Sequence, residues 1–481
     1  MSNLSDLLPA GAGGKTADFT ASGTLSSGQV VVLNSNGTVS GVTETTSSSG
    51  TPVNFNSGSS RTYMEPAVVY HPVQDKTVFF FRDSGASNYG KAIVGTVSGT
   101  TISFSGATEY TFESGTVGEL AAVYDSNIDR IVVVYENASN YTEAKVVTVS
   151  GNTLSFSGAS GIGSTTNYED NSVCFDSSSN KIIFAASSQT NSGYGHARVL
   201  TATTSSVSSG TVVTFVSSSV RLGQAVYDAN ANKTVIAYNR SGARAVVGTV
   251  SGTDITFGSE ATVSTAGSNS YNVAAAYDSD NNKVVVAYRT GLSANDGNAN
   301  VGTVSGTDIT FGSAVQYFST SADHTAIVYD ATAKKMVIAF ADGNSNGKLV
   351  EGTVSGDSIS FTSATTYQSG SVNDLDKAGA YDSSAGKTVF SYQLDSNKDD
   401  YAFVHRSAGT DSDGFIGITE AAISDTSTGS IVLQGGVSEK VSGLTTGSTY
   451  YVQDDGTLAT TTSSVEAGKA LSATKILIKG V

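Results

Sequence analysis

The sequence has no tryptophan, only four prolines and a single cysteine, Cys174, among its 481 residues. One cysteine excludes an intrachain disulfide. We expect Cys174 to be a buried core residue rather than a nucleophile, because free cysteine packs as a small hydrophobic side chain. No stretch approaches the ~20 apolar residues that a membrane-spanning helix needs, so membrane insertion is not expected.

Charge is also scarce, since Asp, Glu, Lys and Arg make up 14% of the chain. The formal net charge is −16, which opposes binding to phosphate backbones. Nucleic acid is therefore not expected as a partner. The opening residues 1–15, MSNLSDLLPAGAGGK, lack a basic n-region and a long apolar run, so no signal peptide is predicted. We expect synthesis in the cytoplasm and a route outward other than ordinary secretion.

A seven-residue pattern recurs seven times along the chain: an aromatic residue, usually Asp next, and a basic residue six positions after the aromatic. The aromatic residues, called anchors below, lie 50–54 residues apart. Self-similarity at such a period predicts a repeat architecture. The anchors are Tyr70, Tyr124, Phe175, Tyr227, Tyr277, Tyr329 and Tyr381.

Asp follows every anchor except Tyr70, which precedes His71, and the basic residue is present in all seven repeats. In one repeat Asp278, Asp280 and Asn282 resemble the start of a calcium loop, but these oxygen ligands do not recur, and no metal site is predicted. We expect Asp to cap a hairpin turn and to face the basic residue as an exposed ion pair worth about 0–1 kcal/mol. The pairs are Asp125 with Arg130, Asp176 with Lys181, Asp228 with Lys233, Asp278 with Lys283, Asp330 with Lys335, and Asp382 with Lys387.

Each repeat reads as four short strands separated by Gly, Asn and Asp turns. Around Tyr277 they are expected at residues 273–277, 283–288, 300–305 and 308–311. Four antiparallel strands per repeat and seven repeats predict an all-β chain containing a seven-bladed β-propeller over residues 48–410. The last repeat lacks its fourth strand, and residues 51–55, TPVNF, supply a matching one. We therefore predict that residues 51–55 close the ring by completing the last blade, which removes two exposed sheet edges.

One face of the predicted propeller carries the variable loops, where binding usually takes place. Tyr168 and Glu169 lie in these loops, and Arg82 and Arg289 share a position just after the second strand. A second set stands five residues before each anchor, at the mouth of the central channel, and six of its seven members are polar. Either the polar residues reflect a water-filled mouth, or they form a site for a cation or a polyhydroxyl ligand. This ring comprises Glu65, Glu119, Asp170, Leu222, Asn272, His324 and Asp376.

Residues 16–46 and 413–481 lack the repeated pattern and have a different sequence character. Each contains a hairpin signal, Asn-Gly within residues 29–42 and Asp-Gly within 448–461. Neither segment has enough strands for a core of its own. Together they predict one small β-sandwich or barrel into which the propeller is inserted.

The phrases LSSGQVVVLNSNGTV, GFIGI, VSGLTTGSTYYVQDDGTLATT and AGKALSATKILIKG resemble the small β domain of virion structural proteins of tailed bacteriophages. They are most similar to tail-fibre-like proteins of marine and cyanobacterial phages. The resemblance implies that residues 1–15 are an attachment peptide. It also implies that residues 1–46 and 413–481 bind other virion proteins, and that the protein is located in the virion after assembly in the host cytoplasm. Fibre shafts of this kind are trimeric, which leaves a homo-oligomer open.

Three functions are compatible with these features. The first is a non-enzymatic tail-fibre or spike-like protein whose propeller recognises a host surface or its glycans. The second is a capsid or tail decoration protein in which the propeller is only architectural. The third is a propeller-type glycan hydrolase, which would need paired carboxylates such as those of Glu65, Glu119 and Asp170. No further catalytic motif accompanies these acids, so we expect no enzyme, no cofactor and no bound metal.

Overall fold

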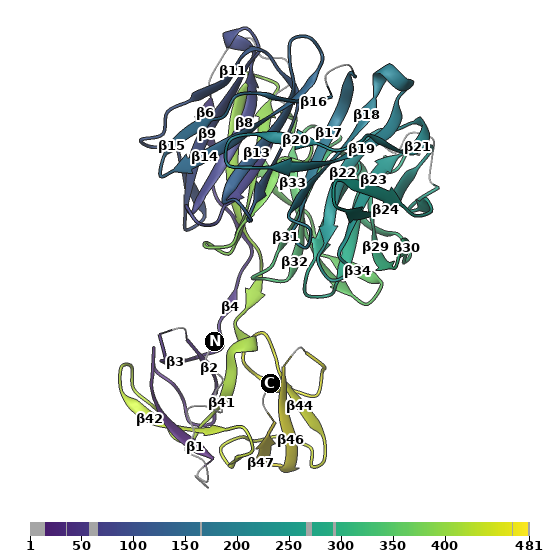
Figure 1. Cartoon of the computed structure of the whole chain (residues 1–481). Coiled ribbons are helices and arrows are strands. Elements are labelled where there is room, and N and C mark those ends of the chain that lie inside the picture. The colour runs from purple at the N-terminus through teal and green to yellow at the C-terminus, as the bar shows by residue number, and fades with distance from the viewer. Residues whose placement is uncertain are drawn as a thin grey trace. The chain divides into compact units, whose positions relative to one another are not determined.

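The structure is a computed structural model that describes residues 15–34, 36–56, 66–163, 166–265, 272–291, 295–463 and 465–479. The chain divides into two compact units: Ser48–Ser407, and Met1–Ser47 with Ala408–Val481. Both units consist of strands (Figure 1). No described helix is long and apolar enough to cross a membrane.

The described part of unit Ser48–Ser407 contains one antiparallel sheet for each of the seven repeats, and the strand β31 (Val315–Asp330) joins the fifth and sixth of them into one nine-stranded sheet. The first strands are β7 (Ala67–His71), β12 (Gly118–Asp125), β17 (Tyr168–Asp176), β22 (Arg221–Asp228), β27 (Ala274–Asp278), the second half of β31 (Val315–Asp330) and β37 (Gly379–Asp382). The second strands are β8 (Lys76–Asp83), β13 (Arg130–Glu136), β18 (Lys181–Ser188), β23 (Lys233–Asn239), β28 (Lys283–Arg289), β32 (Lys335–Asp342) and β38 (Lys387–Leu394). The third strands are β9 (Tyr89–Ser98), β14 (Thr142–Ser150), β19 (Tyr194–Ala202), β24 (Ala243–Ser251), β29 (Asp296–Ser305), β33 (Gly347–Ser355) and β39 (Asp399–Arg406).

The outer strand of each sheet consists of two short segments that pair with the same third strand. These segments are β10 (Thr101–Ser103) with β11 (Tyr110–Thr116), β15 (Thr153–Phe156) with β16 (Ser160–Gly163), β20 (Val207–Ser209) with β21 (Val213–Ser219), β25 (Asp254–Phe257) with β26 (Ala261–Thr262), β30 (Asp308–Phe311) with the first half of β31, and β34 (Ser358–Phe361) with β35 (Thr365–Gln368). The pattern around Tyr277 therefore matches the four expected strands, although the third begins earlier, at Asp296.

The first strands contact one another in a closed cycle, because each touches the next and β37 touches β7. Four-stranded sheets that follow one another in such a cycle have the architecture of a β-propeller. In the last sheet the outer strand comes from the start of the unit. There β39 pairs with β5 (Ser48–Ser49) and β6 (Val53–Asn56), in the registers His405↔Ser49 and Ala402↔Val53. The segment predicted to complete this sheet therefore occupies its edge.

Apolar side chains fill the spaces between neighbouring sheets. Val78 and Phe80 of the first sheet, for example, share a core with Val133 and Tyr135 of the second. Cys174 is buried in a similar core, as expected, and burial raises the pKa of its thiol to about 12.

The Asp after each anchor caps the turn between the first and second strands. The Oδ1 of Asp278 accepts the backbone N–H groups of Asp280 and Asn281 at 3.0 and 2.9 Å, and the other five Asp residues make similar bonds. The expected ion pair is wrong: in none of the six pairs, all described, does the Asp bind its basic partner. The Asp carboxylates are buried in the turn, whereas Lys283 extends along its sheet to Thr303 Oγ1, at 2.6 Å.

The other unit contains two five-stranded sheets. One has the order β1 (Thr16–Thr20), β42 (Thr428–Leu433), β41 (Phe415–Thr419), β2 (Val30–Leu33), β3 (Val39–Gly41). The other has the order β43 (Val437–Ser438), β47 (Lys475–Ile478), β46 (Glu466–Ser472), β44 (Thr449–Val452), β45 (Leu458–Ala459). Val30 and Phe415 of the first sheet share one core with Val452 and Ile476 of the second. A core between two sheets is the arrangement of a β-sandwich.

Candidate ligand site at the channel mouth

The first strands are irregular five residues before the anchors, at the ring position. In the second, third and sixth sheets the pairing with the second strand shifts register there, which marks a β-bulge. The backbone at Glu119, Asp170, Asn272 and His324 has φ between 50° and 60°, a region that residues with a Cβ rarely occupy. Backbone strain of this kind clusters at ligand sites and switches. The ring position is therefore a functional candidate on its backbone as well as on its side chains.

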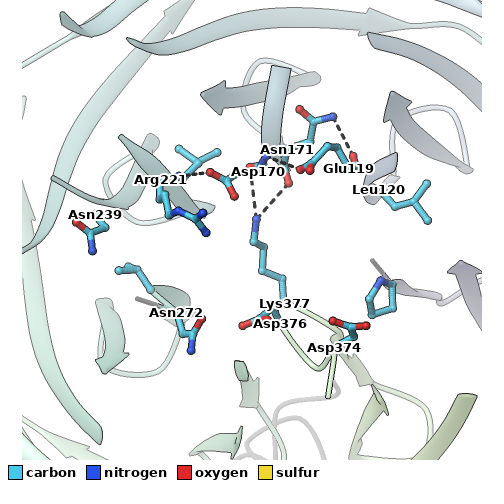
Figure 2. Close-up of a pocket in the computed structure, with 13 residues that line it drawn as sticks. Glu119, Leu120, Asp170, Asn171, Arg221, Asn239, Asn272, Asp374, Asp376 and Lys377 are labelled. Carbon is cyan, nitrogen blue, oxygen red and sulfur yellow. Dashed lines mark hydrogen bonds between the residues drawn. The ribbon is translucent and has the colours of Figure 1, made fainter. Parts of the chain in front are cut away.

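A cavity of about 220 Å³ opens among these bulges (Figure 2). Of the predicted ring, it brings together Glu119, Asp170, Leu222, Asn272 and Asp376. We call it the mouth cavity; its lining residues are Pro66, Glu119, Leu120, Asp170, Asn171, Arg221, Leu222, Asn239, Asn272, Val273, Asp374, Asp376 and Lys377. Glu65 lies outside the described residues.

Two of the ring carboxylates join neighbouring first strands. The backbone N–H of Asp170 donates to Glu119 Oε2, and the backbone N–H of Leu222 donates to Asp170 Oδ2 at 3.2 Å. Asn171 Nδ2 also donates to the carbonyl oxygen of Glu119, at 2.9 Å. Each of these carboxylates thus accepts a backbone N–H from the next sheet. Part of the polar ring is therefore structural.

His324 is attached to the ring through Asp376, because its Nδ1 lies 2.8 Å from Asp376 Oδ2. Burial lowers the pKa of His324, but the hydrogen bond to Asp376 and the charges of Asp376, Asp374 and Asp323 outweigh burial and raise the pKa above its ordinary value. The raised pKa favours the protonated imidazole, the form that offsets the charge of Asp376.

Lys377 is the feature of the site that the sequence reasoning missed. It follows Asp376 in the seventh repeat, has φ +60°, and extends across the mouth cavity (Figure 2). Its Nζ lies 3.4 Å from the carbonyl oxygen of Asp170 and 3.5 Å from that of Asn171, both in the third repeat. A signal was available: of the seven residues four positions before the anchors, Lys377 alone is charged.

The structure corrects the expectation for Tyr168. This side chain is buried, it packs edge-on against Phe184, and its hydroxyl lies 3.3 Å from His196 Nδ1. It therefore belongs to the core and cannot stack on a ligand. The prediction assumed that Tyr168 lies in a variable loop, where aromatic residues usually contact ligands. Tyr168 is instead the first residue of β17.

The other loop candidates do not line the mouth cavity. Glu169 is exposed, and Arg82 is half-buried at the end of β8. Arg289 donates to Asp323 Oδ1 in the neighbouring sheet. Since the cavity contains none of them, the ring and the loops do not form one site. The described residues include no group of three His, Cys, Asp or Glu side chains that could hold a metal ion.

No family model and no curated protein sequence matches the chain. Similar solved structures exist, and the BP39L lectin from Burkholderia pseudomallei superposes with a TM-score of 0.53 at 12% identity, over 72% of this chain and 97% of the lectin. Raptor from Chaetomium thermophilum gives a TM-score of 0.49 at 8% identity, over 74% of this chain and 29% of Raptor. Sqt1 from the same organism gives 0.46 at 10% identity, over 74% of this chain and 97% of Sqt1. The likeness to the lectin shows a β-propeller fold.

Proposed function

We propose that this chain is a non-enzymatic surface protein of a tailed-bacteriophage virion. Residues 48–407 form a complete seven-bladed propeller, closed by β5 and β6, whose channel mouth recognises glycans of the host surface. Residues 1–47 and 408–481 attach the protein to the particle. The virion role is supported by the resemblance of four phrases in these segments to phage structural proteins.

The observation that carries the glycan proposal is the mouth cavity. It combines carboxylate, amide and basic groups at the surface of a rigid ring, and such convergent polar groups bind hydroxyls by directed hydrogen bonds. The strained bulges hold these groups in place before a ligand arrives, which lowers the ordering cost of binding. A similar fold in a protein described as a lectin is compatible with this use.

The test is binding of the full chain to host-surface polysaccharide, compared with a variant of the mouth and a variant elsewhere. Asn239→Ala removes a lining amide outside the first-strand bulges and leaves the charge of the mouth cavity unchanged. Val73→Ala changes a residue that is 65% exposed in the turn between β7 and β8. We expect saturable binding that the mouth variant weakens at least tenfold and that Val73→Ala leaves unchanged.

Copy number on the particle tests the virion role. Quantitative mass spectrometry of purified virions should find a few copies, as expected of a tail protein. Absence from the particle would contradict the proposal. Many copies on the shell, together with no polysaccharide binding, would instead assign the protein to decoration.

A further inference from the structure

Lys377 holds its position across the mouth cavity by weak contacts. Its Nζ lies 3.4 and 3.5 Å from two main-chain oxygens, beyond the 2.7–3.2 Å of ordinary N–H···O bonds. The same oxygens would bind another ammonium group at shorter distance.

An unused acceptor lies at the same place. Asn171 is 2% exposed, lines the mouth cavity, and its Oδ1 has no hydrogen-bond partner. A buried acceptor without a donor is costly, and such groups in native structures call for an explanation. The Oδ1 atom has less than 1 Å² exposed, so a ligand that donates hydrogen bonds would reach it only after the surrounding side chains move.

The charge of the lining also favours a cationic ligand. Four carboxylates line the mouth cavity, against two basic side chains, Arg221 and Lys377. Four minus two leaves an excess of two negative charges, which protonation of His324 beside Asp376 reduces by one. The carboxylates are Glu119, Asp170, Asp374 and Asp376.

Lys377 also borders a second, smaller cavity of about 60 Å³. Both cavities share Pro66, Leu120, Asn171 and Lys377, and the smaller one adds the polar side chains of Ser172 and Gln224. Displacement of the Lys377 ammonium would therefore open the mouth cavity toward the smaller cavity and enlarge the space for a ligand.

We infer that the channel mouth binds a polyhydroxyl ligand bearing a primary ammonium group, as a sugar with an unacetylated amine does, and that Lys377 occupies the ammonium position in the free protein. This inference rests on the proposed glycan recognition and names its ligand class. The ligand ammonium replaces Lys377 Nζ at the carbonyl oxygens of Asp170 and Asn171. Hydroxyls of the same ligand contact the carboxylates and amides of the rim.

The substitution Lys377→Met gives opposite results for a cationic and an anionic ligand. When a side chain occupies the site, the apparent affinity equals the intrinsic affinity multiplied by the fraction of molecules in which the site is open. Removal of Lys377 therefore strengthens binding of a cationic ligand. If the ligand were anionic, Lys377 would be its partner, and the same substitution would abolish binding. Lys398→Met is the matched control, because Lys398 is also left-handed, with φ +59°, and its ammonium pairs with Asp395 instead of entering the mouth cavity.

The experiment is calorimetric titration of the full chain with three oligosaccharides of equal length: glucosamine, N-acetylglucosamine and a uronic acid. We expect the free amine to bind at least tenfold more tightly than its acetylated counterpart. Lys377→Met should tighten binding of the free amine by about tenfold, whereas Lys377→Arg and Lys398→Met should not. Melting curves of the variants check that they fold.

Stronger binding of the acetylated or acidic sugar, or loss of binding in a folded Lys377→Met, would overturn the inference and leave glycan recognition standing. No binding of any of the three sugars, together with no binding of host polysaccharide, would overturn both.

Discussion

The hydroxyls of the six tyrosine anchors bond to the turn of their own sheet, to the turn of the sheet before, or to both. The hydroxyl of Tyr277 donates to Asn282 Oδ1 at 3.1 Å and accepts the backbone N–H of Asn230 at 3.2 Å. The hydroxyl of Tyr329 likewise donates to Asp280 Oδ2 at 2.5 Å. At Tyr277, Tyr329 and Tyr381 the anchor hydroxyl thus connects neighbouring sheets, whereas the third anchor, Phe175, has no hydroxyl to do so.

The buried anchor hydroxyls predict that the protein loses stability at alkaline pH. Burial, followed by neighbouring carboxylates, raises the pKa of Tyr70, Tyr124 and Tyr277 from 10.0 to about 12. Between these values the unfolded state binds fewer protons than the folded state, so the free energy of unfolding falls as pH rises. Denaturant unfolding at a series of alkaline pH values should show this fall. Tyr124→Phe should make it shallower, and an unchanged slope in that variant would contradict the assignment.

At the scale of elements, glycine allows neighbouring sheets to approach closely. Gly258 follows β25, and a Cβ there would overlap the carbonyl oxygen of Thr307 in the turn of the next sheet. Gly50, Gly210 and Gly312 face the equivalent turns in the same way. The glycine between the two segments of the outer strand is therefore required, because the backbone of the next sheet leaves no room for a side chain there.

Gly258→Ala should lower the free energy of unfolding by about 1–3 kcal/mol, the usual cost of overpacking a close contact. Gly158→Ala is the matched control, because a Cβ at Gly158 meets nothing within 4 Å and its φ is not positive. That control should stay within about 0.5 kcal/mol of the parent protein. Chemical denaturation of both variants measures the difference, and equal effects would contradict the role given to Gly258.

At the scale of the whole molecule, the ring depends on a strand that comes from the other end of the unit. Phe55 on β6 is buried against Phe79, Phe81 and Phe104, with ring centroids 5.2–5.5 Å apart. Ser49 on β5 lies 2.9 Å from His405 Nδ1, whose Nε2 lies 2.9 Å from Glu351 Oε1 in the preceding sheet. Apolar packing thus holds β6 in the closing strand, and polar contacts hold β5.

Deletion of residues 48–56 should open the ring and lower the melting temperature sharply, because the edges of β39 and its neighbours become exposed. Phe55→Ala tests the same closure without deleting backbone, and we expect it to cost about 3–5 kcal/mol. Val73→Ala, on an exposed turn, serves as its control. A deletion variant that melts like the parent protein would show that closure does not stabilise the unit.

The sequence predicted features that depend on local turns and on the repeat period. The spacing of the anchors placed the turns capped by Asp278 and its equivalents, and the missing outer strand of the last repeat pointed to residues 51–55. At the site, the ring position was found by counting from the anchors, and Glu119, Asp170, Asn272 and Asp376 line one cavity. Counting succeeds because every repeat has the same strand pattern and hence the same depth along the channel.

By itself the sequence determined the all-β class, the number of repeats and the positions of the turns, because turn chemistry acts over a few neighbouring residues. Only the tertiary structure decided which side chains meet. Lys377 crosses to residues 206 and 207 positions away, and Tyr168 turns into the core instead of the loop. Such contacts depend on ring closure, which brings distant repeats face to face around one channel.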